Sequence, residues 1–261
     1  MKNQDIAHVG KVLFEAWKSK QAIAPLSQSN PDLTLEDAYQ ISLSFLTLRQ
    51  HAGATTIGKK IGVTSKAVQE MLDVHQPDFG YLTNDMLYVQ NQDMPISKLL
   101  ISPRAEGEIA FVLKKDLIGP NVTVQDVLNA TDYVVPCFEV VDSRIKNWQI
   151  TIEDTVADNA SCGLFVLGDT KTLPSEVDFE GCEMIVTKNG KEVSRGLGSA
   201  AMGSPLACVA WLANTFSRLG NDLKAGEIIL SGSLVPLEPV TAGDTMTVEV
   251  SGLGSATVNF T

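Results

Sequence analysis

The chain is organised around two apolar segments that contain carboxylates: ISPRAEGEIAFVL at residues 101–113 and VVPCFEVV at residues 134–141. Successive side chains of a strand point to opposite faces, so Glu106 and Glu108 would share one face. The residues after Glu108 are apolar on both alternating faces, which predicts a strand buried on both sides. Glu139 lies alone inside the second apolar run. The two segments therefore predict adjacent buried strands that carry acidic groups.

A carboxylate in such surroundings must be neutralised, paired with a cation or bound to a metal, because an isolated buried charge is too costly. Three carboxylates that converge on one space favour a hard divalent cation such as Mg²⁺ or Mn²⁺. The alternative is that Glu106, Glu108 and Glu139 lie at solvated strand ends or each meet a Lys or Arg. The spacing alone leaves both interpretations open.

Composition bounds the kind of protein. The 261 residues include 44% hydrophobic residues, and a mean hydropathy of +0.08 is that of an ordinary globular chain. A net charge of −11 argues against binding to nucleic acid or to anionic membranes, because both select basic surfaces. The N-terminus does not resemble a signal peptide, and no apolar run is long enough for a membrane span. We therefore expect a cytoplasmic protein.

The four cysteines and three histidines are scattered along the chain, without the spacing of a zinc site. Several of the cysteines lie in apolar runs. They are most simply explained as buried free thiols in a reducing compartment; they are Cys137, Cys162, Cys182 and Cys208.

The first 55 residues predict a small helical lobe. Apolar residues recur at helical spacing over residues 5–20. A second helix is predicted after Thr34, which can cap it, and it should end near Gly53. The remaining residues, 56–261, have short β-like runs punctuated by Gly, Pro and Asn, and predict a β-rich domain.

Two stretches at the start of that domain contain a charged residue, Lys60 or Asp78, whose role the pattern leaves open between structure and function. Residues 56–64 predict a strand in which Lys60 lies on a face with glycines, and the pattern favours a solvated face over space for a ligand. Residues 65–72 predict a short helix. Residues 75–82 look irregular, and the pattern favours a turn residue over an acid/base for Asp78.

Further along the chain, residues 154–163 are small and polar and include Ser161. They predict either a turn before a strand or a backbone that a ligand approaches closely. The remaining segments have clear patterns: a helix beginning near residue 122, a hairpin turning at Asn189-Gly190, a helix from Ser204 to Gly220, and strands over residues 227–233, 245–250 and 256–260.

Taken together, five motifs resemble a known family. They are IGKKIGVT (57–64), HQPDFG (75–80), RAEGEIA (104–110), PCFEVVDSR (136–144) and DTVADNAS (154–161). In this order they resemble the 2-hydroxypenta-2,4-dienoate (2-keto-4-pentenoate, vinylpyruvate) hydratases of bacterial meta-cleavage pathways, and the likeness extends along essentially the whole chain. The resemblance implies the fumarylacetoacetate-hydrolase-like fold, which is α+β with a mixed β-roll body and a small helical N-terminal lobe.

The resemblance also implies a site and a substrate, a small 2-hydroxydienoate. It assigns a divalent metal, Mg²⁺ or Mn²⁺, to Glu106, Glu108 and Glu139. Asp78 would move protons and activate water, while Lys60 would place positive charge beside the C2 oxygen and Ser161 would hydrogen-bond the substrate or the water. The expected reaction is hydration to 4-hydroxy-2-oxopentanoate.

Alternatives and partners remain to be separated. The sister enzyme 4-oxalocrotonate decarboxylase shares the fold and the metal carboxylates, but the Pro77-Asp-Phe-Gly80 motif favours the hydratase. A non-catalytic acidic module for protein assembly is the remote alternative. The resemblance further implies a homo-oligomer and a complex with 4-oxalocrotonate decarboxylase.

Overall fold

A computed structural model describes residues 1–65, 69, 74 and 76–261. In the described part of the chain the strands form two sheets, one of eight strands and one of five. The larger follows the order β2-β1-β10-β5-β6-β7-β3, with β11 paired to β5; the smaller follows the order β4-β13-β12-β8-β9. The larger sheet contains β1 (Thr56–Gly62), β2 (Asp78–Thr83), β3 (Leu87–Tyr88), β5 (Pro103–Leu113), β6 (Thr131–Asp142), β7 (Leu164–Leu167), β10 (Ile228–Leu230) and β11 (Glu238–Pro239). The smaller contains β4 (Asp93–Met94), β8 (Glu183–Lys188), β9 (Lys191–Leu197), β12 (Thr245–Val250) and β13 (Gly254–Phe260).

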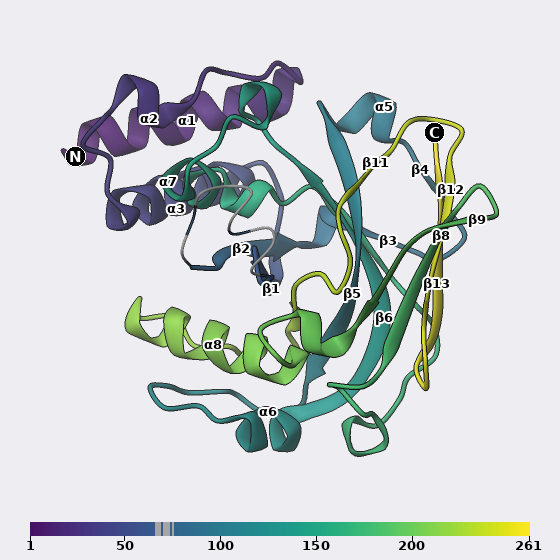
Figure 1. Cartoon of the computed structure of the whole chain (residues 1–261). Coiled ribbons are helices and arrows are strands. Elements are labelled where there is room, and N and C mark those ends of the chain that lie inside the picture. The colour runs from purple at the N-terminus through teal and green to yellow at the C-terminus, as the bar shows by residue number, and fades with distance from the viewer. Residues whose placement is uncertain (66–68, 70–73, 75) are drawn as a thin grey trace.

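Most of the helices lie on the larger sheet's side of the molecule, away from the five-stranded sheet, whereas one short helix directly follows β4 of the smaller sheet (Figure 1). The short helix is α5 (Ile96–Leu99), and the others are α1 (Asn3–Ser19), α2 (Leu26–Ser29), α3 (Leu35–His51), α6 (Val124–Ala130), α7 (Ile152–Ala157) and α8 (Pro205–Arg218). Short 3₁₀ turns are η1 (Asn84–Met86), η2 (Lys146–Trp148), η3 (Asn159–Ser161), η4 (Pro174–Glu176) and η5 (Gly198–Ala200).

The N-terminal helices form as the sequence predicts. Thr34 caps α3 by accepting a hydrogen bond from the Asp37 amide at 3.2 Å, and the reciprocal bond completes a capping box. Helix α3 packs against both α1 and α7. The change from helix to strand falls between His51 and Thr56. However, one hydrophobic cluster contains residues from both sides of that point, so the division into domains 1–55 and 56–261 stays a prediction.

Long, curved strands β5 and β6 connect the two layers of the molecule (Figure 1). They pair antiparallel over most of their length. Where they meet the smaller sheet, Gly107 leaves no room for a side chain, because a Cβ atom there would lie 2.6 Å from Met184 Sδ. The close approach of the sheets fixes one face of β5 against apolar residues and turns the neighbouring positions, Glu106 and Glu108, to the opposite face.

The structure corrects two predictions about the first strands. Residues 78–82, which belong to the stretch predicted to be irregular, lie in strand β2, because the backbone groups of β2 pair antiparallel with β1. Asp78 is therefore a buried strand residue, and the interpretation as a turn residue was wrong. The solvated face predicted for Lys60 was also wrong, since Lys60 is buried.

Other elements agree with the sequence patterns. The helix near residue 122 is α6, the hairpin is β8–β9, and the helix after Ser204 is α8. The small polar stretch at residues 154–163 is more structured than predicted. It contains the end of helix α7 and the 3₁₀ turn η3. The helix predicted at residues 65–72 falls mostly outside the described residues.

At the level of fold class the prediction is confirmed: the protein is α+β, with mixed sheets and N-terminal helices. All four cysteines are free and buried, as predicted. None of the helices that the structure describes is long and apolar enough to cross a membrane.

Candidate active site

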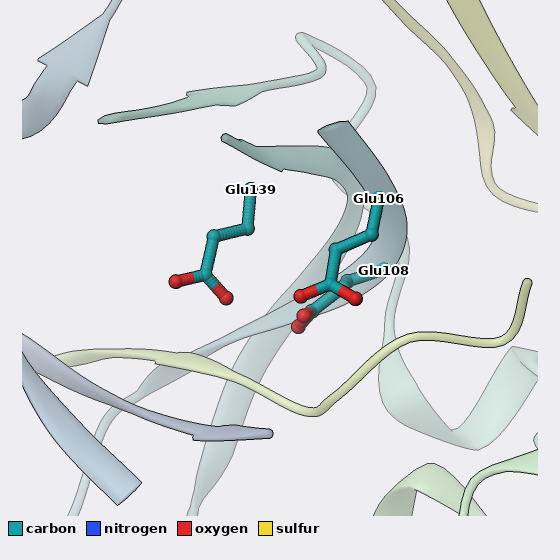
Figure 2. A group of neighbouring side chains, drawn as sticks. All are labelled: Glu106, Glu108 and Glu139. Atoms are coloured by element: carbon teal, nitrogen blue, oxygen red, sulfur yellow. The ribbon is translucent and has the colours of Figure 1, made fainter. Parts of the chain in front are cut away.

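Three glutamates meet on the inner face of strands β5 and β6. Glu106 lies directly opposite Glu139 in the antiparallel register, and Glu108 is two residues further along β5. One oxygen from each carboxylate lies within 4.8 Å of the others, and all three side chains are buried. Figure 2 shows the carboxylates turned toward a common space. The side-chain alternation of β5, together with its register with β6, brings the group together.

Burial and mutual repulsion make these carboxylates hard to ionise. Burial, followed by the charge of Glu139, raises the pKa of Glu106 to about 8. Burial and the other two glutamates raise the pKa of Glu108 well above its usual value. Burial also raises the pKa of Glu139, although the Lys60 ammonium opposes the shift. With a pKa of about 8, Glu106 holds its proton near neutral pH unless a cation displaces it.

The donor set suits a hard divalent cation. Glu108 Oε2 accepts a hydrogen bond from the Gly232 amide at 2.8 Å. Glu108 Oε1 is buried and has no hydrogen-bond partner in the described part of the chain. An unpartnered buried carboxylate oxygen beside two more carboxylates supplies oxygen ligands, which Mg²⁺ and Mn²⁺ prefer. The alternative of solvated strand ends is excluded by burial, whereas pairing with a lysine is found for Glu139.

Lys60 lies between this cluster and Asp78. Its Nζ is 3.2 Å from Glu139 Oε2 and 3.9 Å from Asp78 Oδ1. Burial opposes the charged form of Lys60, but the carboxylates of Glu139 and Asp78 outweigh it and hold the lysine pKa well above its usual value. The ammonium is therefore a fixed positive charge inside the site.

Two neighbours determine how Asp78 and Lys60 are placed. Thr155 donates a hydrogen bond from Oγ1 to Asp78 Oδ2 at 2.7 Å. Gly62 lies directly opposite Asp78 in the β1–β2 register. A Cβ atom at Gly62 would be 2.5 Å from Asp78 Oδ1 and 2.7 Å from Lys60 Nζ, so a larger residue would displace this pair.

Ser161 belongs to the turn η3, next to the carbonyl of Ala160, which accepts a hydrogen bond from Lys60 Nζ at 3.4 Å. The Ser161 hydroxyl is buried and has no partner among the described residues. The three predicted catalytic residues, Asp78, Lys60 and Ser161, thus line one cavity together with Glu106.

That cavity has a volume of about 520 Å³. Its charged lining residues are Lys60, Asp78, Arg104 and Glu106. The rest of its wall is mainly apolar, and it includes Val141, Trp148, Ile150, Leu234, Val235 and Leu237. A mainly apolar cavity with a few convergent polar groups is typical of a binding site for a small molecule.

Several residues of the cavity were not singled out from the sequence. Thr155 was part of a small polar stretch without an assigned role, and nothing in its local pattern revealed its contact with Asp78. Arg104 lies over the ring of Trp148, 4.7 Å from its centroid, on the cavity wall. Such contacts join segments far apart in the chain, so only the tertiary structure reveals them.

Comparison with known proteins gives the site a family. The model of the fumarylacetoacetate (FAA) hydrolase C-terminal domain matches residues 44–261. A 2-hydroxyhexa-2,4-dienoate hydratase from Comamonas testosteroni is 54% identical over 259 residues, covering 99% of this chain and 98% of its own length. A 2-hydroxypent-2,4-dienoate hydratase from Pseudomonas putida is 60% identical over 215 residues, covering 82% of this chain and 97% of its own length.

A solved structure is similar over the whole fold. It is a 4-oxalocrotonate decarboxylase from Pseudomonas putida G7 complexed with magnesium and adipate, with a TM-score of 0.96, 33% identity, and coverage of 100% of this chain and 99% of the other. Its identity is lower than that of either hydratase. The protein described here belongs to the fumarylacetoacetate hydrolase family, among the 2-hydroxypentadienoate (2-keto-4-pentenoate) hydratases.

Proposed function

We propose that this protein is a lyase that hydrates 2-hydroxypenta-2,4-dienoate to 4-hydroxy-2-oxopentanoate in the meta-cleavage catabolism of aromatic compounds. The observation that carries the proposal is the buried carboxylate cluster with Lys60 and Asp78 beside it, next to a partly apolar cavity that Glu106, Lys60 and Asp78 line. The hydratases that share most of this sequence support the same reaction class.

Glu106, Glu108 and Glu139 hold Mg²⁺ or Mn²⁺ in this proposal. Their close oxygens and their raised pKa values support it, as does the magnesium in the similar decarboxylase structure. A bound cation would polarise the carboxylate and the C2 oxygen of the substrate and so favour the enolate.

The protein's own groups then divide the proton transfers. The Asp78 carboxylate takes the proton of the enol oxygen and delivers it to C5, which gives the conjugated 2-oxo acid. Asp78 next accepts a proton from water as the water oxygen bonds to C4, and it delivers this proton to C3. Lys60 supplies positive charge beside the C2 oxygen, where negative charge develops. Ser161 donates or accepts a hydrogen bond with the substrate or the attacking water, consistent with its unpartnered hydroxyl.

A dienol-consumption assay tests the proposal. Fresh 2-hydroxypenta-2,4-dienoate is followed by the loss of its ultraviolet absorbance, first with EDTA and then with added Mg²⁺ or Mn²⁺, and the product is identified by NMR. We expect metal-restored formation of 4-hydroxy-2-oxopentanoate. Dienol left unchanged under all these conditions would contradict the proposed reaction.

The second candidate is metal-dependent decarboxylation of 2-oxo-3-hexenedioate, favoured by the close structural match to a decarboxylase. It is separated from hydration by measuring carbon dioxide release from that substrate. If carbon dioxide is released while the dienol is untouched, the decarboxylase assignment replaces the hydratase and the role given to Asp78 is wrong.

The proposed enzyme is a homo-oligomer that also associates with 4-oxalocrotonate decarboxylase, which would supply its unstable dienol directly. Light scattering after size exclusion measures the first association. Co-elution with the purified decarboxylase measures the second, and independent elution of the two proteins would argue against transfer within a complex.

A further inference from the structure

The turn η3 has a backbone conformation that L-residues rarely adopt. Asn159, Ala160 and Ser161 have φ angles of 54°, 51° and 52°, so three successive residues without glycine lie in the left-handed region. Each such residue costs free energy, and asparagine alone among these three tolerates the region well. A strained turn of this length persists only where neighbouring groups hold it.

Arg144 holds the turn from the end of β6. Its Nε donates to Asp158 Oδ1 at 2.6 Å, and its Nη1 donates to the Cys162 carbonyl at 2.7 Å. Nη2 donates to the Asp158 carbonyl, and Nη1 also donates to the Asp142 carbonyl at 2.5 Å. One buried guanidinium thus binds the residues immediately before and after η3.

The Asp158 carboxylate completes the attachment. Its Oδ2 accepts a hydrogen bond from the Arg144 amide at 2.9 Å, while its Oδ1 accepts from Arg144 Nε. Both side chains are buried. The planar guanidinium fork matches this set of acceptors in a way that an ammonium cannot.

Asn159 attaches the opposite side of the turn to β2. Its Nδ2 donates to the Tyr81 carbonyl at 2.9 Å, and its Oδ1 accepts from the Tyr81 amide at 2.8 Å. Gly80 permits this approach, since a Cβ atom there would lie 2.5 Å from the Asn159 carbonyl oxygen. Strand β2 also carries Asp78, so the turn and the proposed acid/base are held as one unit.

The turn and the residue after it supply three groups to the site. The Ala160 carbonyl accepts from Lys60 Nζ, and the Ser161 hydroxyl lines the cavity. Cys162 Sγ donates to Glu139 Oε1 at 3.3 Å. A relaxed turn would move all three groups together, because a change of φ at Ala160 redirects the carbonyl and the residues that follow it.

We propose that Arg144 and Asp158 form a positioning pair that imposes the left-handed turn and thereby sets Lys60, Ser161 and Glu139 in their reactive arrangement. The effect on catalysis rests on the proposed hydratase function, whereas the effect on the turn does not. Neither residue touches the cavity in the described structure, so the pair acts through the groups it holds.

The test compares Arg144→Lys with Arg49→Lys. Arg49 is the control, because it is buried, donates to Asp85 at 2.7 Å rather than to the turn, and lies over the ring of Trp17. Its charge lies near Arg144 and Cys162, and lysine keeps that charge, so the comparison isolates the hydrogen bonds of the guanidinium. We expect both variants to lose thermal stability. Only Arg144→Lys should lose kcat, on the order of 100-fold, which is the scale of a small misplacement of catalytic groups.

Alkylation of cysteine provides a readout that does not depend on activity. Iodoacetamide labelling followed by peptide mass spectrometry reports the exposure of Cys162, with Cys137, Cys182 and Cys208 as buried internal references. In Arg144→Lys we expect faster labelling of Cys162 alone. Should Arg144→Lys fail to fold, Asp158→Asn, which keeps the shape and removes the charge, is measured in the same way.

Relief of the strain gives the decisive comparison. Glycine adopts φ near 51° without a steric penalty, so Ala160→Gly should restore part of the lost kcat and the protection of Cys162 in the Arg144→Lys background. If Arg144 only stabilised the fold, Ala160→Gly would restore neither kcat nor the protection of Cys162.

The outcomes separate the two proposals. Wild-type Cys162 protection and kcat in both Arg144→Lys and Asp158→Asn, or equal exposure of all four cysteines, would overturn the positioning pair. So would the absence of rescue by Ala160→Gly. If the wild-type protein does not consume the dienol, the proposed function fails, and Cys162 labelling still decides whether the pair holds the turn.

Discussion

Glu106, Glu108 and Glu139 are buried where their charges repel one another, and Lys60 is the cation nearest to them among the described residues. One ammonium cannot balance three ionised carboxylates, so the cluster either retains protons or binds a further cation. The raised pKa values express the same conflict. At this scale the site is explained by charge and burial before any substrate is considered.

Substitution of single carboxylates should separate metal binding from proton transfer. Glu106→Gln should weaken Mn²⁺ binding by about 100-fold or more and abolish turnover, since even the partners of metal ligands contribute 10–100-fold to affinity. Asp78→Asn should leave Mn²⁺ binding intact and lower kcat by roughly 10² to 10⁴-fold. Calorimetric titration and steady-state kinetics measure the two effects.

Asp116→Asn is the matched control for these carboxylates, because Asp116 pairs with Lys224 on the surface and lies outside the cavity. It should bind Mn²⁺ and turn over normally. Full activity in Asp78→Asn would remove the role given to Asp78.

The hydrogen bond from Thr155 should matter because it fixes one oxygen of Asp78. Thr155→Val keeps the shape of the side chain and removes the donor, so kcat should fall roughly tenfold. Thr131→Val is the control, since Thr131 is buried and donates at 2.7 Å to the Val127 carbonyl, away from the site. Similar losses of kcat in the two variants would mean that the Thr155 bond is only structural.

At the scale of elements, β1 and β2 combine packing and chemistry on opposite faces of one strand pair. Ile61 points into the hydrophobic core, while Lys60 and Gly62 point into the site. Gly62 leaves the space that Asp78 and Lys60 occupy. We therefore expect that substitution of a residue of β1 that faces the core affects activity less than substitution of one that faces the cavity.

Gly62→Ala should abolish most turnover, because its Cβ would displace the carboxylate of Asp78 and the ammonium of Lys60. Ile61→Val, the next residue along β1, should cost about 1 kcal/mol of unfolding free energy and retain kcat. Kinetics and urea unfolding of the two variants measure this contrast. Equal kcat values for Gly62→Ala and Ile61→Val would show that turnover does not need the space beside Gly62.

At the scale of the whole molecule, the carboxylate cluster should link stability to pH and metal. The pKa of Glu106 is about 8 in the folded protein, against an ordinary value of 4.5. Between these values the folded state holds a proton that the unfolded state has released. Its contribution to stability is thus full below about 4.5 and is lost as the pH rises through about 8.

The melting temperature of the EDTA-treated protein should therefore fall from pH 5 to pH 9, and Mg²⁺ should raise it more at pH 9 than at pH 6. Carboxylates with lowered pKa, such as Asp85, are ionised in both states over this range and do not oppose the trend. Scanning calorimetry measures the effect, with Glu106→Gln as the control that weakens it. A melting temperature that rises with pH in EDTA would contradict this account.

The residues of the site differ in how far their sequence predicts them. Glu106, Glu108 and Glu139 are visible because carboxylates inside apolar strands conflict with their surroundings. Asp78 and Lys60 are not visible in this way, because the local pattern favoured a turn for Asp78 and a solvated face for Lys60. Only the resemblance to a family selected them as site residues. Their burial comes from the pairing of β1 with β2, which no local pattern encodes.

The sequence by itself determined the α+β class, the N-terminal helices, the acidic strands and the membership of a hydratase family, because these depend on periodicity, capping and shared motifs. Only the tertiary structure decided that Thr155 holds Asp78, that Gly62 leaves space for Lys60, and that Arg144 and Asp158 hold a strained turn. The physical reason is that each of these contacts joins atoms from different elements. Their distances are fixed by strand register and packing, and not by the local preferences of the residues themselves.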